Sequence, residues 1–289
     1  MRTISSDELK WIPYPGQRAS VTEMQPLFQG APDAPDNFEM YMVRYGEGGS
    51  HSPRHRHNFE QFRWAFEQPL NYGPNQDIPP GCLAYFPEGA YYGPQTNKHG
   101  SIMLIVQFGG ASGQGYMDLQ KLKRGTQELK AKGEFVRGVY TCTDASGKKH
   151  NQDAYEAVWE HMSGRPLKYP KPRYSGPVLI DPNAFEWLPV ARASGVQIRK
   201  FGVFNERGTS AGQLKLAAGT TFSWPLQPAA RLVYVLSGTV DVAGMDFPAR
   251  SSMVLSSGEK AEFRAAEEAI LLVLAMPNFT DTATDVAMG

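Results

Sequence analysis

Short apolar runs recur along the chain, with glycine and proline between them. The runs include MYMVRY, LAYFP, IMLIVQF, QLKLAA, LVYVLSG and ILLVLAM. The 29 glycines and 22 prolines are spread through the segments that separate such runs. Short apolar runs bounded by turn residues are typical of strands in a sandwich or barrel. The pattern therefore predicts an all-β fold.

Helical spacing occurs in the middle of the chain. Apolar residues fall three and four positions apart in MDLQKLKRGTQELKAK and again in QDAYEAVWEHM. We therefore predict a partly helical linker over residues 116–175. One β domain, 1–115, would precede it, and another, 176–289, would follow it.

An internal repeat indicates that the two β domains are related. Three pairs of identical residues lie 176 positions apart, namely Trp11 and Trp187, Pro13 and Pro189, and Phe28 and Phe204. From Gly49, which pairs with Gly219, the separation is 170. The difference matches the Pro-rich segment 31–36, APDAPD, which is present only in the first copy. We infer a duplication.

Composition and charge restrict the classes of function. The 289 residues include 29 Lys and Arg against 29 Asp and Glu, and no segment concentrates positive charge. This charge balance argues against nucleic-acid binding and favours a small organic partner. The sequence has neither an apolar leader nor an apolar stretch of about 18–20 residues, so we expect a cytoplasmic protein without a membrane partner. Cys82 and Cys142 are expected to be reduced thiols.

A pair of histidines gives the strongest chemical signal. His55 and His57 stand in HRHNFEQ, and positions 55, 57, 59, 61 and 63 share one parity. On a strand their side chains would point to the same face. Two imidazoles two positions apart can converge on one metal ion, and a donor four positions further on can complete the set.

The residues around this pair resemble the cupin superfamily. Its first motif is G-x5-H-x-H-x3,4-E-x6-G, and its second is G-x5-P-x-G-x2-H-x3-N. The matching residues are Gly49, His55 and His57 in the first motif, and Gly81, Pro87 and Gly89 in the second. The resemblance implies two jelly-roll (double-stranded β-helix) barrels joined by the linker. It also implies one divalent metal ion in the first barrel, with Fe(II) favoured and Mn(II), Ni(II) or Zn(II) as alternatives.

The chain departs from these motifs at four positions. In the first motif, Gln61 replaces the carboxylate and Gln68 replaces the closing glycine. In the second motif, Tyr92 replaces the last histidine and Thr96 replaces the asparagine. The predicted metal ligands are therefore His55, His57, Gln61 and Tyr92. A neutral Gln weakens the hold on a hard divalent cation. Gln61 could instead fix a histidine tautomer, and Tyr92 could instead donate a proton, contact substrate or pack in the barrel.

Arg63 shares the parity of the histidine pair, and an inward arginine is costly unless it meets an anion. It would hold a substrate carboxylate, or emerge at the barrel mouth and pair with Glu67. Arg63 and Tyr92 are our candidate catalytic residues. Further candidates for the pocket lining are Tyr72, Tyr91 and Gln107.

The sequence predicts the roles of other residues near the motifs less specifically. Glu60 has the opposite parity and is expected to face away from the centre. His51 is either a substitute third imidazole or a solvated loop residue. His99, His150 and His161 are not expected to be ligands. An apolar stripe, Phe62, Trp64 and Phe66, needs covering by the other domain or by a second subunit. This stripe, together with sheet edges that two-barrel proteins often cover by association, makes a homodimer one expectation.

The second repeat serves as an internal control. The positions of His55, His57, Gln61 and Tyr92 become Pro225, Gln227, Arg231 and Glu262, and no histidine follows His161. We therefore predict a second barrel without metal ligands.

The resemblance implies a metal-dependent enzyme that acts on a small oxygenated organic molecule, with a dioxygenase as the leading class. A metal-dependent isomerase or lyase is one alternative. A non-catalytic small-molecule-binding or structural protein is the other, and the loss of ligands in both repeats favours it.

Overall fold

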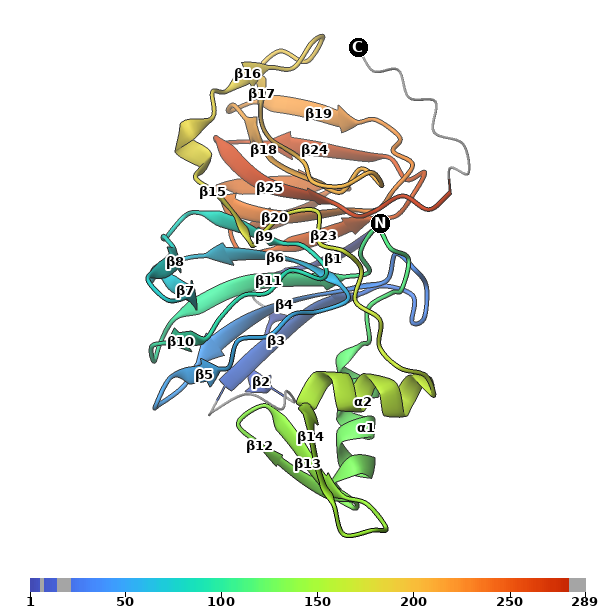
Figure 1. The fold of residues 1–289 in the computed structure, drawn as a ribbon. Coiled ribbons are helices and arrows are strands. Elements are labelled where there is room, and N and C mark those ends of the chain that lie inside the picture. Colours follow the sequence, from blue (N-terminus) through green and yellow to red (C-terminus); the bar gives the residue numbers. More distant parts are fainter. Residues whose placement is uncertain (6–7, 15–21, 281–289) are drawn as a thin grey trace. The chain divides into compact units, whose positions relative to one another are not determined.

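The computed structural model describes residues 1–5, 8–14 and 22–280, which form two compact units (Figure 1). The first repeat and the linker form one unit, Lys10–Ile180. The second repeat forms the other, Asp181–Gly289, together with the first residues of the chain, Met1–Leu9. Both units are built mainly from antiparallel strands, so the prediction of an all-β fold is confirmed.

A seven-stranded antiparallel sheet is the main element of the first unit. Its strand order is β15 (Val178–Ile180), β9 (Leu83–Phe86), β6 (Glu60–Ala65), β11 (Ile102–Phe108), β4 (Phe38–Tyr45), β3 (Thr22–Gln29) and β2 (Ile12–Pro13). Two smaller pairs complete the barrel: β5 (Ser50–Ser52) with β10 (Gln95–Asn97), and β7 (Leu70–Gly73) with β8 (Gln76–Ile78).

The second unit repeats this plan. Its large sheet has the order β1 (Arg2–Ile4), β23 (Ser252–Leu255), β20 (Arg231–Ser237), β25 (Ala269–Ala275), β18 (Ser210–Leu216), β17 (Val196–Val203) and β16 (Leu188–Pro189). A smaller sheet contains β19 (Thr220–Trp224), β24 (Ala261–Ala265), β21 (Thr239–Val242) and β22 (Met245–Pro248). The two large sheets correspond strand for strand, as a duplication requires.

The edge strands of the two large sheets are exchanged. Strand β1 precedes the first repeat but pairs with β23 of the second unit. Its counterpart β15 precedes the second repeat but pairs with β9 of the first unit. The first unit therefore extends to Ile180 rather than ending before the linker. The sequence pattern places the domain boundaries elsewhere because it does not show which sheet an edge strand joins.

The linker contains two helices where helical spacing occurs, α1 (Leu119–Lys130) and α2 (Ala154–Ser163). The side chain of Asp118 caps the start of α1, and Asp153 caps that of α2. A three-stranded sheet that the sequence analysis missed lies between them, with strands β12 (Gly133–Val136), β13 (Val139–Thr143) and β14 (Lys149–Asp153). A short 3₁₀ helix, Pro182–Ala184, begins the second unit.

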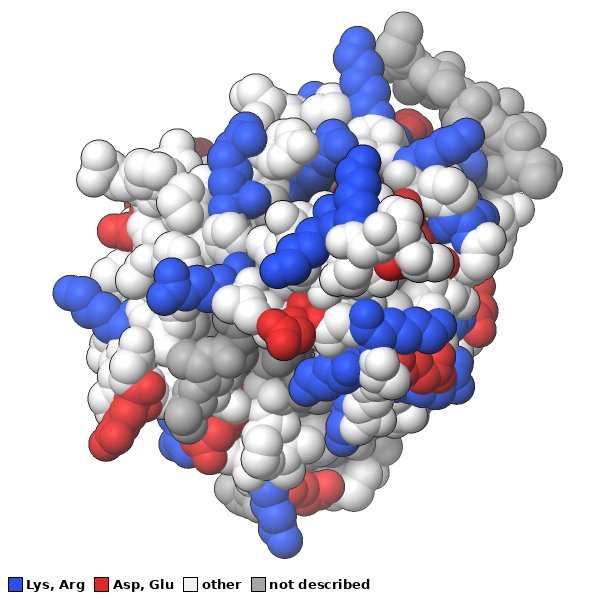
Figure 2. Space-filling view, turned by 60° about the horizontal axis from the view of Figure 1, so that its bottom comes forward, with Lys and Arg blue, Asp and Glu red and all other residues white. Residues whose placement is uncertain are grey.

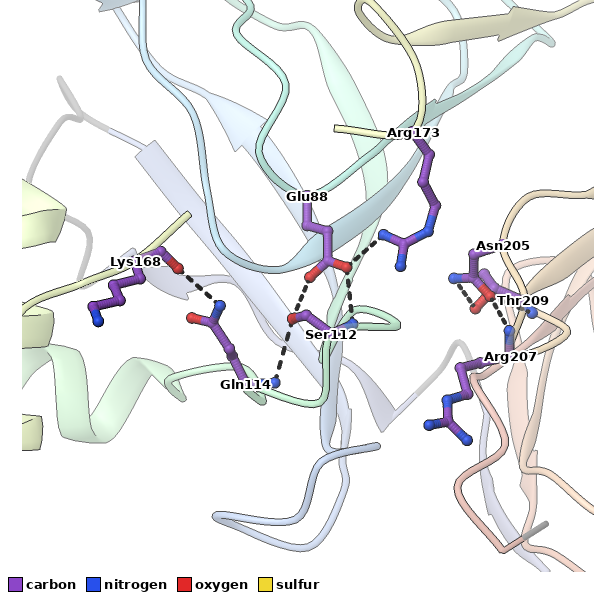
Figure 3. Close-up of polar contacts among 8 residues, drawn as sticks. All are labelled: Glu88, Ser112, Gln114, Lys168, Arg173, Asn205, Arg207 and Thr209. Carbon is purple, nitrogen blue, oxygen red and sulfur yellow. Dashed lines mark hydrogen bonds and ion pairs between the residues drawn. The ribbon is translucent and has the colours of Figure 1, made fainter. Parts of the chain in front are cut away.

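The chain that follows α2 is fastened to the first barrel (Figure 3). The fully buried carboxylate of Glu88 pairs with Arg173 at 2.7 Å and accepts from the backbone N–H and hydroxyl of Ser112 at 2.9 and 2.6 Å. Gln114 donates to the carbonyl of Lys168 at 2.8 Å. These bonds hold residues 168–173 against the first barrel, ahead of β15.

The apolar stripe is buried in part by its own unit. Phe62 stacks on Phe108 and contacts Tyr85, and Trp64 is also buried. The homodimer stays a prediction.

Charged side chains of both signs are interspersed on the face shown in Figure 2. Neither helix in the described part of the chain is long and apolar enough to cross a membrane.

Candidate functional site

A cavity of about 150 Å³ lies inside the first barrel. Strands β4, β6 and β11 supply part of its wall, and the linker contributes Leu119 from α1 and Tyr155 from α2. His55, His57, Arg63 and Tyr92 line it, as their shared parity and motif positions predict. Among the residues that the structure describes, no Asp or Glu lines this cavity.

Backbone contacts between the two motif segments position the histidines. His55 and Tyr92 exchange both backbone N–H···O=C bonds at 3.0 Å, and the carbonyl of His57 accepts from Gly89 at 2.7 Å. Strand β6 begins at Glu60, so the histidine pair lies ahead of the strand rather than on it. The alternation of side chains nevertheless continues through positions 55 to 63.

The motif glycine Gly89 has two physical reasons to be glycine. Its φ of +77° lies in the left-handed region, and an added Cβ would collide with the backbone carbonyl of Pro170. Gly89 thus permits close packing of the returning linker beside the histidine segment.

Side-chain hydrogen bonds join three of the four predicted ligands. The amide nitrogen of Gln61 lies 2.8 Å from His57 Nδ1 and donates to the hydroxyl of Tyr92 at 3.2 Å. The Tyr92 hydroxyl lies 3.0 Å from the same His57 Nδ1. A neutral imidazole nitrogen offers one lone pair, so the Gln61 amide and the Tyr92 hydroxyl compete for it.

His55, the fourth predicted ligand, adjoins this group through its ring. Its ring centroid lies 4.9 Å from that of His57 and 4.4 Å from that of Tyr92. Its Nδ1 lies 2.6 Å from the carbonyl of Pro53. Because a carbonyl only accepts, Nδ1 carries the proton, which in a neutral ring leaves the lone pair on Nε2.

Arg63 reaches into the centre of this group and is only 8% exposed. It donates to Gln61 Oε1 from Nε at 2.9 Å and from Nη2 at 2.8 Å, to Gln95 Oε1 at 2.8 Å and to the hydroxyl of Tyr92 at 3.1 Å. Its guanidinium also lies over the ring of Phe86, 4.2 Å from the centroid. The alternative of a surface pair with Glu67 is therefore wrong, because Arg63 is turned inward.

A second polar network forms another side of the cavity. Tyr41 and Tyr116 both reach Gln107 Oε1 at 2.8 Å, and the Tyr116 hydroxyl also lies 2.8 Å from Glu39 Oε2. Burial raises the pKa of Glu39 to about 7, against the lowering effect of its bonds to Tyr116 and Leu119. Burial also raises the pKa of both tyrosines well above the usual value, which keeps them protonated.

Proton counting agrees with a protonated Glu39. Tyr116 has one hydroxyl proton but two oxygen neighbours at hydrogen-bond distance. If the carboxyl of Glu39 donates to Tyr116, then Tyr116 can donate to Gln107 and both short contacts are satisfied. An ionised Glu39 could only accept a hydrogen bond, so the single proton of the Tyr116 hydroxyl would point to it. The Gln107 amide would then have to turn so that its N–H donates to the Tyr116 oxygen.

Several secondary predictions have clear outcomes. Gln107 lines the cavity as expected. Tyr72 and Tyr91 are wrong as lining residues: Tyr72 packs in the barrel core, and Tyr91 is exposed against the guanidinium of Arg54. His51 is exposed beside Thr96, His99 is exposed, and His150 and His161 contact Asp144 and Glu128 in the linker. Glu60 is buried outside the described cavity lining.

Five residues of the site were missed by sequence reasoning. Glu39, Tyr41, Tyr116 and Tyr155 lie outside the two motifs, and only the fold brings them to the cavity or to its polar network. Gln95 stands in GPQTN, three positions after Tyr92, and this spacing was the one available signal.

The corresponding positions of the second unit also hold an arginine and a glutamine. Arg231 donates to Gln227 Oε1 at 3.0 Å and to the carbonyls of Ala229 and Ala230 at 3.1 and 3.3 Å. Glu262 accepts from Arg264 at 2.8 Å.

The donor set of the first barrel does not fit a divalent metal ion as it is arranged. Gln61 turns its amide oxygen to Arg63, the Tyr92 hydroxyl accepts from Arg63, and His57 Nδ1 faces an N–H donor. In the part of the chain that the structure describes, no three His, Cys, Asp or Glu side chains are grouped to hold a metal. Ligation by His55, His57, Gln61 and Tyr92 thus stays a prediction that this geometry does not favour.

Comparisons with known proteins identify the fold. No family model and no curated protein matches the chain. Similar solved structures include a presumed dioxygenase of Nostoc punctiforme, with 10% identity, a TM-score of 0.63, and coverage of 98% of this chain and 85% of that one. Another is Streptomyces albus HEPD with 2-hydroxyethylphosphonate and Fe(II) bound, with 11% identity, a TM-score of 0.59, and coverage of 97% and 77%.

A third similar structure is the formate complex of Lactobacillus farciminis oxalate decarboxylase, with 13% identity, a TM-score of 0.54, and coverage of 96% and 86%. Each similarity extends over nearly the whole of this chain. The chain therefore shares the two-barrel fold of these structures, which is the fold that the motif resemblance implies. At these identities the likeness shows the fold, and the function has to be argued from the site.

Proposed function

We propose that the first barrel binds a small organic molecule through an anionic oxygen group, such as a carboxylate, and acts on it by proton transfer. One observation carries the proposal: Arg63 is a buried cation whose hydrogen-bond partners, Gln61, Gln95 and Tyr92, are all neutral. A buried charge without a counter-charge is costly. An anionic ligand in the adjoining cavity would supply that counter-charge.

The hydrogen-bonding capacity of Arg63 supports this role. A guanidinium has five N–H groups, and the four bonds to Gln61, Gln95 and Tyr92 use four of them. The fifth, on Nη1, can donate to a ligand. The amide nitrogen of Gln107 is a second donor for the cavity, since the oxygen of this amide already accepts from Tyr41.

The cavity limits the size of the ligand. A volume of about 150 Å³ is comparable to engineered protein cavities that hold one benzene molecule. Aromatic rings of Phe59, Tyr116 and Tyr155 line part of the wall. A compact carboxylate of roughly six to ten non-hydrogen atoms, by comparison with that volume, therefore fits best.

His57 and Tyr92 provide the acid–base chemistry. Their contact of 3.0 Å lets the Tyr92 hydroxyl donate to Nδ1 or turn toward a ligand. Loss or gain of a proton by a bound ligand can then be matched by this pair, and Arg63 would stabilise negative charge that develops on the ligand oxygens. This chemistry belongs to the isomerase or lyase class.

The metal-dependent dioxygenase with Fe(II) stays a prediction. Its support is the Fe(II) bound in the Streptomyces albus structure and the activity presumed for the Nostoc punctiforme protein. Binding without catalysis is a second candidate, which the neutral Gln61 in place of a carboxylate favours.

A ligand screen tests the proposal. The Tm of the wild-type protein is measured with paired probes that differ in charge but little in shape: acetate with acetamide, benzoate with benzamide, and phenylacetate with phenylacetamide. We expect at least one carboxylate to raise the Tm while its amide does not, because only the anion neutralises Arg63. Equal shifts within every pair, or no shift with any probe, would contradict the proposal.

A further inference from the structure

The position of Arg63 among the predicted metal ligands has a second consequence. Its guanidinium bonds directly to Gln61 and Tyr92, and Gln61 and Tyr92 both contact Nδ1 of His57. A cation therefore already sits in the group of donors that a metal would use, and it belongs to the chain itself.

Arg63 also fixes the orientation of the Gln61 amide. Two guanidinium N–H groups converge on Oε1, so the reversed amide would point its own N–H groups at other donors. The oxygen of Gln61 is therefore held toward Arg63 and its nitrogen toward His57 Nδ1. Both the amide oxygen and the imidazole lone pair are engaged, and neither is presented to a metal ion.

We propose that the guanidinium of Arg63 takes the place of the divalent metal in the first barrel, so that this barrel binds its anionic ligand without a metal ion. The proposal rests on the proposed function for the nature of the ligand. It goes further by assigning the positive charge of the site to a side chain.

A metal centre of the expected kind and the Arg63–Gln61 pair have the same net charge. A divalent ion with one carboxylate ligand has a net charge of +1, and neutral Gln61 with Arg63 also has a net charge of +1. An anionic ligand would thus meet a similar total charge in either case. Loss of the carboxylate and gain of an inward guanidinium each add one positive charge, and together they make up for the two charges of the missing ion.

The second barrel contains a related pair. Arg231 occupies the position that corresponds to Gln61, and its guanidinium bonds to Gln227, which corresponds to His57. In each barrel a guanidinium therefore bonds to a glutamine that stands at a predicted ligand position or at its counterpart, but the two arginines themselves do not correspond, since the counterpart of Arg63 is Val233.

A double-mutant cycle with Co(II) tests the proposal. Titrations of Co(II), followed by its visible absorption and by calorimetry, compare the wild type with Gln61→Glu, Arg63→Leu and the double variant. The double variant, which restores a carboxylate and removes the guanidinium, is expected to bind Co(II) at least about 100-fold more tightly than the wild type. Gln61→Glu alone is expected to gain less than about tenfold, because Arg63 would pair with the new carboxylate.

Two results would overturn the proposal. One is metal in near-stoichiometric amount in wild-type protein purified without chelator and lost from His55→Ala/His57→Ala. The other is equally tight Co(II) binding by Gln61→Glu and the double variant. The metal content of the wild type needs no variant, so the proposal stays testable even if Arg63→Leu does not fold; Arg63→Met then replaces it.

Ligand binding with and without chelator separates this proposal from the proposed function. A carboxylate that raises the Tm equally in EDTA and in Mn(II) supports both. A shift seen only with Mn(II) leaves anion binding intact but refutes metal independence. Protein that binds neither metal nor any carboxylate refutes the proposed function, and with it anion binding by Arg63, but agrees with a guanidinium in the place of the metal.

Discussion

Arg63 donates two hydrogen bonds, of 2.9 and 2.8 Å, to the amide oxygen of Gln61, which lies two positions before it on the same strand. Residues two apart on a strand share a face, so β6 places the guanidinium beside the predicted ligand. The pair settles the direction of the Gln61 amide and, through it, the proton acceptor on His57. The chemistry that we propose for the cavity depends on this local contact.

Replacement of Gln61 by leucine should destabilise the protein because it leaves two N–H groups of a buried guanidinium without an acceptor. Hydrogen bonds to charged groups contribute about 1.5–3 kcal/mol each, so we expect a loss of roughly 3 kcal/mol in the free energy of unfolding. Gln61→Glu is the matched control, since it keeps an acceptor for Arg63. Urea unfolding of both variants checks this; equal stabilities would mean that the bonds are not important to the fold.

Tyr92→Phe should separate binding from chemistry. The variant keeps Arg63, so a bound carboxylate should lose less than about tenfold in affinity, whereas proton transfer through Tyr92 should slow by about 100-fold or more. The measurement is loss of the Cα–H signal of phenylacetate in D₂O by proton NMR. Exchange at the wild-type rate in Tyr92→Phe would remove Tyr92 from the mechanism, and absence of exchange in the wild type would favour binding without catalysis.

Glu39 should give the protein a distinct pH dependence. Its pKa is raised to about 7 in the folded state from an ordinary 4.5, so the folded state binds the proton more tightly than the unfolded state does. The resulting stability is fully present below pH 4.5 and is lost as the pH rises through 7. At 1.36 kcal/mol per pKa unit, the loss amounts to about 3 kcal/mol.

The isosteric Glu39→Gln variant cannot titrate at this position. We therefore expect its free energy of unfolding, relative to that of the wild type, to increase by about 3 kcal/mol between pH 4.5 and pH 7.5. Chemical denaturation across this range measures the difference. A constant difference between the two proteins would show that folding does not raise the pKa of Glu39.

Two motif glycines make a matched test of packing at the site. Gly89 and Gly81 have nearly the same φ, +77° and +76°, but only at Gly89 would a new Cβ meet backbone, the carbonyl of Pro170. Gly81→Ala should cost only the conformational penalty of about 1–2 kcal/mol. Gly89→Ala should cost at least about 2 kcal/mol more, because the returning linker must shift. Equal costs in thermal unfolding would contradict the close approach.

The sequence predicted the repeated barrels because turn residues, short apolar runs and a long-range offset all leave local marks. It also predicted the inward face of positions 55 to 63 from parity alone. The exchange of β1 and β15 left no such mark, since pairing of edge strands depends on the whole fold. Glu39, Tyr116 and Tyr155 could not be predicted for the same reason.

The role of Arg63 was only half predicted. Parity showed that its side chain points inward, but whether a buried guanidinium meets an anion, a surface acid or neutral amides depends on which side chains surround it. The structure shows that Gln61, Gln95 and Tyr92 surround it. That result turns the expected metal centre into a candidate anion site.

Calorimetric titration of benzoate into the wild type and into Arg63→Met, with EDTA present throughout, tests the central claim most directly. Loss of a charge-assisted hydrogen bond of about 1.5–3 kcal/mol corresponds to a roughly 10- to 150-fold change in affinity, so we expect the variant to bind benzoate at least about tenfold more weakly. Arg63→Lys, which keeps the charge, should recover part of the affinity. Equal binding of benzoate by the wild type and Arg63→Met would contradict the account.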